Sequence, residues 1–333
     1  MYTLNISVIV TSYNRKNFVK NAIKSVIRQD VDSSRCELII VSNYNIELNQ
    51  FPTNMPISII VMEGTVGEFI LAGIKRAKYD LIAFLDDDDE FELSKIESVL
   101  PFFENDNKLV FYHNSLNYID DSGNPKNYSR MVESRFQKLS SNTIIFSSSN
   151  GIEKLDLALK QNADFNLSCI VIRKNNFKAY EELLKDIEGS TDGFFFWTSV
   201  ISGGNIIVST EKLTRYRVHC FNVTKSNSFE GKVTEIGKQI KTFSLILDIN
   251  ESENSDVNKI LIKKWIEMMK LEYEMIQMIF SHNRRGELLK KAKILCGYDR
   301  RFTNALKYRL LFFSCVYLIF PSIAFFIYKK LSR

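Results

Sequence analysis

The sequence is poor in cysteine and histidine, with 5 Cys and 3 His among 333 residues. The cysteines are odd in number, scattered and without CxxC spacing, which argues against a zinc cluster or a disulfide framework and is typical of a reducing compartment. The chain also lacks an internal repeat and an N-terminal secretory signal pattern, since it passes from Met1 directly into a strand-like stretch at Ile6. The cysteines are Cys36, Cys169, Cys220, Cys296 and Cys315.

The whole chain has a formal net charge of +5, and its basic residues are concentrated in the last third. A basic stretch of this kind suits either nucleic acid or an anionic membrane surface. The segment that follows it distinguishes the two. The basic residues are Lys290, Lys291, Lys293, Arg300, Arg301, Lys307 and Arg309.

Residues 310–328 are 19 residues without a charge, flanked by cations on both sides. About 20 apolar residues cross the hydrocarbon core of a bilayer, and a membrane helix tolerates a proline such as Pro321. The sequence therefore predicts a membrane anchor at 307–333, a membrane-associated protein whose N-terminal bulk lies in the cytoplasm, and no nucleic-acid partner. The alternative is a buried apolar hairpin broken at Pro321.

The first hundred residues alternate between short apolar stretches and amphipathic stretches. Strands are expected at 6–10, 37–41, 57–61 and 81–85, and helices at about 17–29, around 66–77 and at 93–103. Uniformly apolar strands that alternate with helices indicate an α/β fold with a mostly parallel central sheet, covered by helices on both faces. In such sheets ligands bind beyond the carboxyl ends of the strands.

The rest of the chain is less regular. Strands are expected at 109–112, 169–172 and 206–208, a surface hairpin or mobile loop at 120–135, and a long amphipathic helix at 260–280. The apolar content of 45% supports a sizeable core. The expected domains are a catalytic domain at 1–228 with halves 1–104 and 105–228, a helical region at 229–306, and the anchor at 307–333.

Four adjacent carboxylates, Asp86 to Asp89, follow the fourth expected strand directly. Carboxylates that converge at a strand end repel one another and need a cation or raised pKa values to coexist. Hard oxygen ligands suit Mg²⁺ or Mn²⁺, which could also hold a substrate diphosphate. The alternative is a solvated acidic turn that caps the next helix near Leu93.

Three segments of the chain resemble the N-terminal half of family 2 glycosyltransferases in the order and spacing of that family. They are residues 6–15 (ISVIVTSYNR), 37–41 (ELIIV) and 79–89 (YDLIAFLDDDD). The resemblance implies a GT-A fold and a nucleotide-sugar donor. It covers about residues 5–225, so the helical region and the apolar tail lie outside it.

By this resemblance Thr11, Tyr13 and Arg15 line the nucleotide pocket. Tyr13 offers a ring face near a base, although a simple packing role is the alternative. The three residues 86–88 correspond to the DXD motif, with Asp88 as the principal metal ligand and Asp86 near the ribose or the metal. Asp87 is the spacer within this donor site, and Asp89 matches an extra acid often found after the motif.

The chain departs from the family after the second strand, where an acidic pair usually contacts the uracil or ribose. Here Ser42 and Asn43 occupy these positions. Either side chain could hydrogen-bond a base, in a different manner from a carboxylate. The nucleotide of the donor is therefore left open.

Two further motifs match the family downstream. Asp192, within Gly-Ser-Thr-Asp, corresponds to the acid that deprotonates the acceptor hydroxyl, although Thr191 replaces the usual glutamate and a helix cap is the alternative. The stretch 216–224 resembles a Tyr-Arg-x-His-x-x-Asn-x-Ser motif near the end of the catalytic domain. There Arg217 is expected to pair with the diphosphate and His219 to be a third metal ligand or to bond a phosphate.

The sequence thus predicts an inverting, metal-dependent glycosyltransferase that moves a sugar from a nucleoside-diphosphate donor to a lipid-linked or surface glycan. The alternative is a catalytically inactive GT-A module that acts as a binding or scaffold protein, as the missing acids allow. A nucleotidyl enzyme on a related fold is disfavoured, because the first strand is not followed by a Gly- and Lys/Arg-rich phosphate loop.

Overall fold

The computed structural model divides the chain into two compact units, Met1–Cys220 and Phe221–Arg333. The sequence predicts a boundary nearby, after residue 228. The structure describes residues 4–126, 142–219, 229–251, 257–281, 290–291 and 294.

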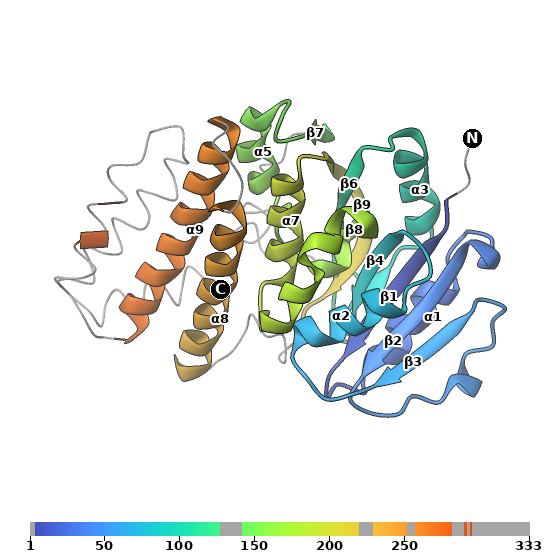
Figure 1. Cartoon of the computed structure of the whole chain (residues 1–333). Helices are drawn as coiled ribbons and strands as arrows, with labels where there is room; N and C mark the ends of the chain where they lie inside the picture. Colours follow the sequence, from blue (N-terminus) through green and yellow to red (C-terminus); the bar gives the residue numbers. More distant parts are fainter. Residues whose placement is uncertain are drawn as a thin grey trace. The chain divides into compact units, whose positions relative to one another are not determined.

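The first unit begins with parallel strands in the order β3-β2-β1-β4 (Figure 1). Because the strands are parallel, their carboxyl ends lie at one edge of the sheet. These strands confirm all four predicted in the first hundred residues. Their bounds are β1 (Ile6–Ser12), β2 (Cys36–Ser42), β3 (Ile57–Val61) and β4 (Leu81–Asp86).

The helices of this half are α1 (Val19–Ile27) and α2 (Val66–Arg76), which connect these strands, and α3 (Lys95–Asn105), which follows β4. Helix α2 begins with a capping box, in which Thr65 Oγ1 accepts from Glu68 N at 3.2 Å and Glu68 Oε2 accepts from Thr65 N at 2.7 Å. This reciprocal pair satisfies two backbone donors that a helix start otherwise leaves open.

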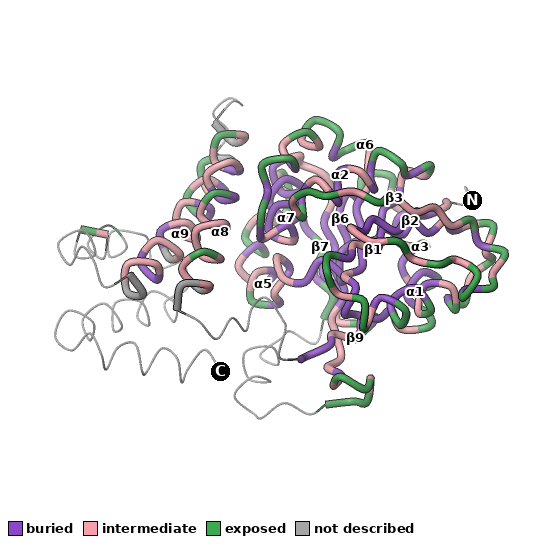
Figure 2. Tube along the Cα trace, turned by 90° about the horizontal axis from the view of Figure 1, so that it is seen from below, coloured by how far each residue is buried: buried purple, intermediate pink, exposed green. Residues whose placement is uncertain are grey.

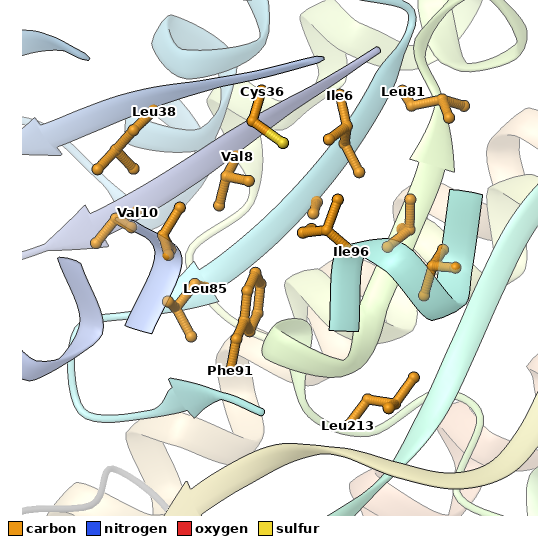
Figure 3. Packing of buried hydrophobic residues seen from close by; sticks show 14 of the residues in the cluster. Ile6, Val8, Val10, Cys36, Leu38, Leu81, Leu85, Phe91, Ile96 and Leu213 are labelled. Atoms are coloured by element: carbon orange, nitrogen blue, oxygen red, sulfur yellow. The ribbon is translucent and has the colours of Figure 1, made fainter. Parts of the chain in front are cut away.

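Helices cover both faces of this part of the sheet. On one face, alternate strand residues such as Ile6, Val8 and Leu81 pack with Ile96 of α3 (Figure 3). On the other face, Ile9 lies against Gly73 of α2, and Phe84 stacks on Phe195 at a ring separation of 4.6 Å. The central strands are buried accordingly (Figure 2), so the strand ends are left as the place for a site.

The second half of this unit adds strands in the order β4-β8-β6-β9-β5, with β7 paired to β9. Strand β8 is antiparallel to both β4 and β6, whereas β6 and β9 are parallel. The sheet is thus parallel from β1 to β4, as predicted, and mixed in the second half, because uniform apolarity reports burial on both faces and carries no information on strand direction. The bounds are β5 (Glu90–Phe91), β6 (Leu109–Ile119), β7 (Ile144–Phe146), β8 (Ile170–Arg173) and β9 (Asn205–Arg217).

The helices of this half are α5 (Leu155–Lys160), α6 (Lys174–Phe177) and α7 (Thr191–Ser202), and a 3-10 turn at Leu167–Cys169 precedes β8. Helix α7 is apolar and buried on nearly all sides, with Phe194 and Trp197 fully inside. It therefore forms a fixed support for the residues at its N-terminus.

The second unit contains α8 (Phe229–Glu251) and α9 (Val257–Ser281), whose Phe243 and Tyr273 rings stack at 5.5 Å. Helix α9 confirms the predicted long helix at 260–280. In the described ranges we find no helix with the length and apolarity that a bilayer span requires. The predicted anchor at 307–333 lies outside the described residues.

Candidate active site

The ends of three strands bring most of the predicted site residues together. The parallel register of β1 and β4 places Thr11 beside Asp86, and Arg15 follows β1. Strand β5 follows the acidic turn directly and pairs with β9. The end of β9 therefore lies beside the acidic turn, and His219 just after it reaches Asp88. Segments far apart in the sequence therefore meet at the carboxyl end of β4.

Asp88 is the centre of this cluster. Its Oδ2 atom accepts a bond from Arg15 Nη1 at 2.5 Å and lies 3.0 Å from His219 Nε2. The same guanidinium reaches Asp87 Oδ1 at 2.6 Å, and Asp87 Oδ2 accepts from Ser12 Oγ at 2.7 Å. Arg15 thus bridges two neighbouring carboxylates.

The buried environment of the acidic turn raises the pKa values of three of its four carboxylates. Burial raises the pKa of Asp86 well above its usual range, with the charges of Asp88 and Asp89 adding to it. Burial also raises the pKa values of Asp87 and Asp89 to about 7. For Asp88 burial acts in the same direction, but the His219 hydrogen bond and Arg15 outweigh it and leave the pKa below its ordinary value.

This donor set suits a hard divalent cation chemically, because carboxylate oxygens are the ligands that Mg²⁺ and Mn²⁺ prefer. Asp86 is the only partly exposed carboxylate of the four. In the ranges that the structure describes, no three His, Cys, Asp or Glu side chains gather closely enough to hold a metal. The predicted set of Asp86, Asp88 and His219 is thus not assembled around one point, and Arg15 holds the Asp88 oxygen.

Arg217 differs from its predicted role. The side chain is fully buried, and Nε donates to the Asp88 carbonyl at 2.9 Å while Nη1 donates to the carbonyls of residues 120–121 at 2.7 and 3.0 Å. Nη2 forms an ion pair with Glu90, and the backbone N–H donates to Asp89 Oδ1 at 3.0 Å. The predicted contact with a diphosphate does not fit this placement, because these partners direct Arg217 toward holding the shape of the acidic turn.

Asp87, which was expected within the donor site, contacts protein groups instead. Its side chain is buried against Ser12 and Arg15. Asp87 is the first residue of the turn that follows β4, and there its carboxylate contacts the end of β1 at Ser12. Asp87 therefore positions Arg15.

The residues after β2 are arranged as a closed turn. Ser42 is buried, and its Oγ donates to Tyr44 O at 2.6 Å and accepts from Tyr44 N at 3.0 Å, so its hydroxyl proton is engaged within the turn and the predicted bond to a base stays a prediction. Asn43 exchanges hydrogen bonds of 2.8 and 2.9 Å with Asn14. Tyr13 is 50% exposed and meets Phe69 edge-on at 5.8 Å, so an open ring face is present beside this turn.

Asp192 is the second residue of α7 and is partly exposed. Its Oδ2 accepts from the backbone N–H of Asn166 at 2.8 Å, and its Oδ1 accepts from Gly193 N at 2.9 Å. The side chain of Asn166 in turn donates to Asp89 Oδ2 at 3.0 Å. One residue therefore connects Asp192 to the acidic turn.

Sequence reasoning missed Asn166 and two further residues of this region. Lys95 is fully buried, donates to the Ser168 carbonyl and to Thr214 Oγ1, and has its pKa lowered to about 7 by burial. Asp164 has its pKa raised to about 7 by burial and by the charge of Asp192. Of these three residues only Lys95 has a sequence signal, because it is a lysine on the apolar face of a predicted helix. Asp164 and Asn166 lie in a loop without a motif.

The sequence is similar to known glycosyltransferases. The family model described as "Glycosyl transferase family 2" matches residues 7–181. An uncharacterized glycosyltransferase of Haemophilus influenzae is 36% identical over 113 residues, which are 32% of this chain and 38% of that protein. One of Rickettsia bellii is 34% identical over 125 residues, 35% of this chain and 18% of that protein. The matches thus span well under half of these relatives.

Solved structures resemble the fold at low identity. TarS 1-349 of S. aureus, in complex with UDP-GlcNAc, has a TM-score of 0.56 at 14% identity, covering 96% of this chain and 88% of that one. The mannosyltransferase PcManGT of Pyrobaculum calidifontis, in complex with GDP-Man and Mn²⁺, has a TM-score of 0.55 at 11% identity and the same coverage. With the family match over more than half of the sequence, the chain belongs to glycosyl transferase family 2 and has the GT-A fold.

Proposed function

We propose that the chain transfers a sugar from a nucleoside-diphosphate donor to an acceptor hydroxyl with inversion at the anomeric carbon. One observation carries this proposal: Asp192, the expected base, is joined through Asn166 to the acidic turn expected to hold the donor diphosphate. A base and a donor site held in one frame are what a one-step displacement requires.

The donor end of the site lies between β1 and β4. Tyr13 would offer its exposed side chain to a base, Thr11 lies beside Asp86, and Arg15, which pairs with Asp88, would contact the diphosphate. Asp86 and Asp88 are the residues that would hold a divalent cation, with His219 at its side. When bound, Mn²⁺ or Mg²⁺ neutralises the charge of the departing diphosphate.

Asp192 is the proposed general base. Its carboxylate is partly exposed at the start of a rigid helix, where the hydrogen bonds from Asn166 and Gly193 fix its orientation. Each carboxylate oxygen accepts one of these bonds and keeps a second lone pair, which can accept the proton of the acceptor hydroxyl. A single carboxylate in this role matches inversion.

The acceptor is proposed to be a lipid-linked or surface glycan. This rests on the apolar segment 310–328 and its basic flanks, which would hold the enzyme at the membrane with the catalytic domain in the cytoplasm. The nucleotide-sugar class is supported by the donors named for the structurally similar proteins, UDP-GlcNAc and GDP-Man. The sugar of this chain's donor is left to experiment.

The test measures release of nucleoside diphosphate from a panel of nucleotide sugars by the full chain, with Mn²⁺ and with EDTA. The proposal expects release with at least one donor, its loss in EDTA, and its loss in Asp88→Ala. Activity that persists in EDTA or in Asp88→Ala contradicts the metal site. Donor binding without any turnover supports the inactive binding module instead.

A further inference from the structure

Asn166 occupies an unusual backbone position between the two halves of the site. Its φ angle is 69°, a region that residues with a side chain rarely adopt. In this conformation its backbone N–H points to Asp192 Oδ2 at 2.8 Å and its side-chain amide to Asp89 Oδ2 at 3.0 Å. An extended or helical backbone here would change the direction of one donor relative to the other.

The position is costly for a folded chain. Besides the positive φ, the side-chain carbonyl Oδ1 is buried, and among the described residues no donor reaches it. Both features lower stability. Glycine would adopt this φ freely, would keep the N–H that faces Asp192, and would remove the unpaired oxygen.

Asp89 is anchored on its other side, since its Oδ1 accepts from Arg217 N at 3.0 Å. The end of β4 is fixed as well, because Asp86 N donates to Ser168 Oγ at 3.0 Å. The side-chain amide of Asn166 therefore bonds to a carboxylate that is itself held in place. What it restrains is the loop whose N–H orients Asp192.

We propose that Asn166 is a positioning residue that fixes the Asp192 carboxylate relative to the Asp86–Asp89 turn, and thereby relative to the anomeric carbon of a bound donor. The inference rests on the proposed function, in which Asp192 is the base. Asn166 acts through Asp192, and its own side chain takes no part in donor binding.

The test compares Asn166→Gly with the wild-type full chain in three measurements: melting temperature, donor affinity by calorimetry, and kcat. The expected result is a melting temperature within about 3 °C of wild type, a donor Kd within about twofold, and a kcat lower by about tenfold or more, since a small displacement of a base has an effect of that size. Asn162→Gly is the matched control, because Asn162 has a φ of 54° in the same loop and none of its described bonds reaches Asp89 or Asp192. It should leave all three values unchanged.

Asn166→Asp adds a check on placement. It exchanges an amide donor for a carboxylate beside Asp89, so the melting temperature should fall while that of Asn166→Gly does not. Unchanged kcat in Asn166→Gly overturns the inference and leaves the proposed function intact. Equal losses of stability, donor affinity and kcat in Asn166→Gly overturn it in favour of a structural role, and a wild-type chain without turnover overturns both proposals.

Discussion

Arg15 and Asp88 form an ion pair of 2.5 Å at the very oxygen that His219 also reaches. The Asp88 side chain is 8% exposed and that of Arg15 is 31% exposed, so the arginine can leave toward solvent and the aspartate cannot. A divalent cation and Arg15 would therefore compete for the carboxylates of Asp87 and Asp88. This relationship leads to the first prediction.

Replacing Arg15 with glutamine should make the fold more responsive to divalent cations. Without the guanidinium, Asp87 and Asp88 lose the cation that they share, so Mn²⁺ binding stabilises the variant more than the wild type. The measurement is the shift in melting temperature on adding Mn²⁺ to each protein. Arg35→Gln is the control, since Arg35 pairs with Glu104 outside the site. Equal Mn²⁺ shifts in wild type and Arg15→Gln would contradict the shared-site account.

Gly67→Ala should destabilise the catalytic unit by about 2–3 kcal/mol. A Cβ at Gly67 would lie 1.8 Å from the Leu184 carbonyl oxygen, and Gly67 N donates to Ile187 O at 3.1 Å, so the chain that leads to Asp192 must move. Urea unfolding measures the loss. Gly237→Ala in α8 is the matched control, because among the described residues a Cβ there meets only Gln277 Nε2, at 3.5 Å, and it should stabilise by up to about 1 kcal/mol. An unchanged unfolding free energy for Gly67→Ala would disprove the close approach.

Asp164→Asn should become more stable than the wild type as the pH rises. Burial and Asp192 raise the pKa of Asp164 to about 7 in the folded chain, above the value of about 4 for an unfolded aspartate. The folded state thus holds a proton that the unfolded state releases, and this contribution is complete below about pH 4 and is lost as the pH rises through 7.

The difference in unfolding free energy between Asp164→Asn and wild type should therefore grow between pH 5 and pH 8.5 by about 1–2 kcal/mol, discounted for partial exposure. Asp30→Asn, the same substitution at an exposed aspartate, is the matched control. A difference that stays constant or shrinks with pH would mean that Asp164 is not held neutral.

Tyr13→Ala should raise the donor KM by about tenfold, because stacking of a base on an aromatic ring contributes on the order of 1–3 kcal/mol. Tyr13→Phe keeps the ring and should stay near the wild-type value. Steady-state kinetics with the donor varied makes the comparison. If both variants behave as wild type, the exposed ring face does not bind the nucleotide.

The early fold and the acidic turn could be predicted because their signals are local. Each strand of the first half is a continuous apolar stretch, and a row of aspartates directly after Leu85 can only lie at a strand end. The direction of β8 and the length of β6 could not be predicted, because they depend on pairing between segments far apart in the sequence.

The roles of individual site residues were harder to predict for the same reason. Motif position placed Arg217 and Ser42 in the site region, but burial and hydrogen-bond partners decide what each side chain contacts. Asn166 carries no sequence signal at all, since its importance comes from a backbone angle and from two acids located 77 and 26 residues away. Such a residue is visible only once the chain is folded.

The central claim is that Asp192 removes the acceptor proton while the acidic turn holds the donor. The most direct measurement is a side-by-side comparison of donor Kd and kcat for Asp192→Asn and wild type with Mn²⁺ present. The account predicts a Kd within about twofold and a kcat lower by about 100-fold or more, the size of a general-base contribution. A wild-type kcat in Asp192→Asn would contradict it.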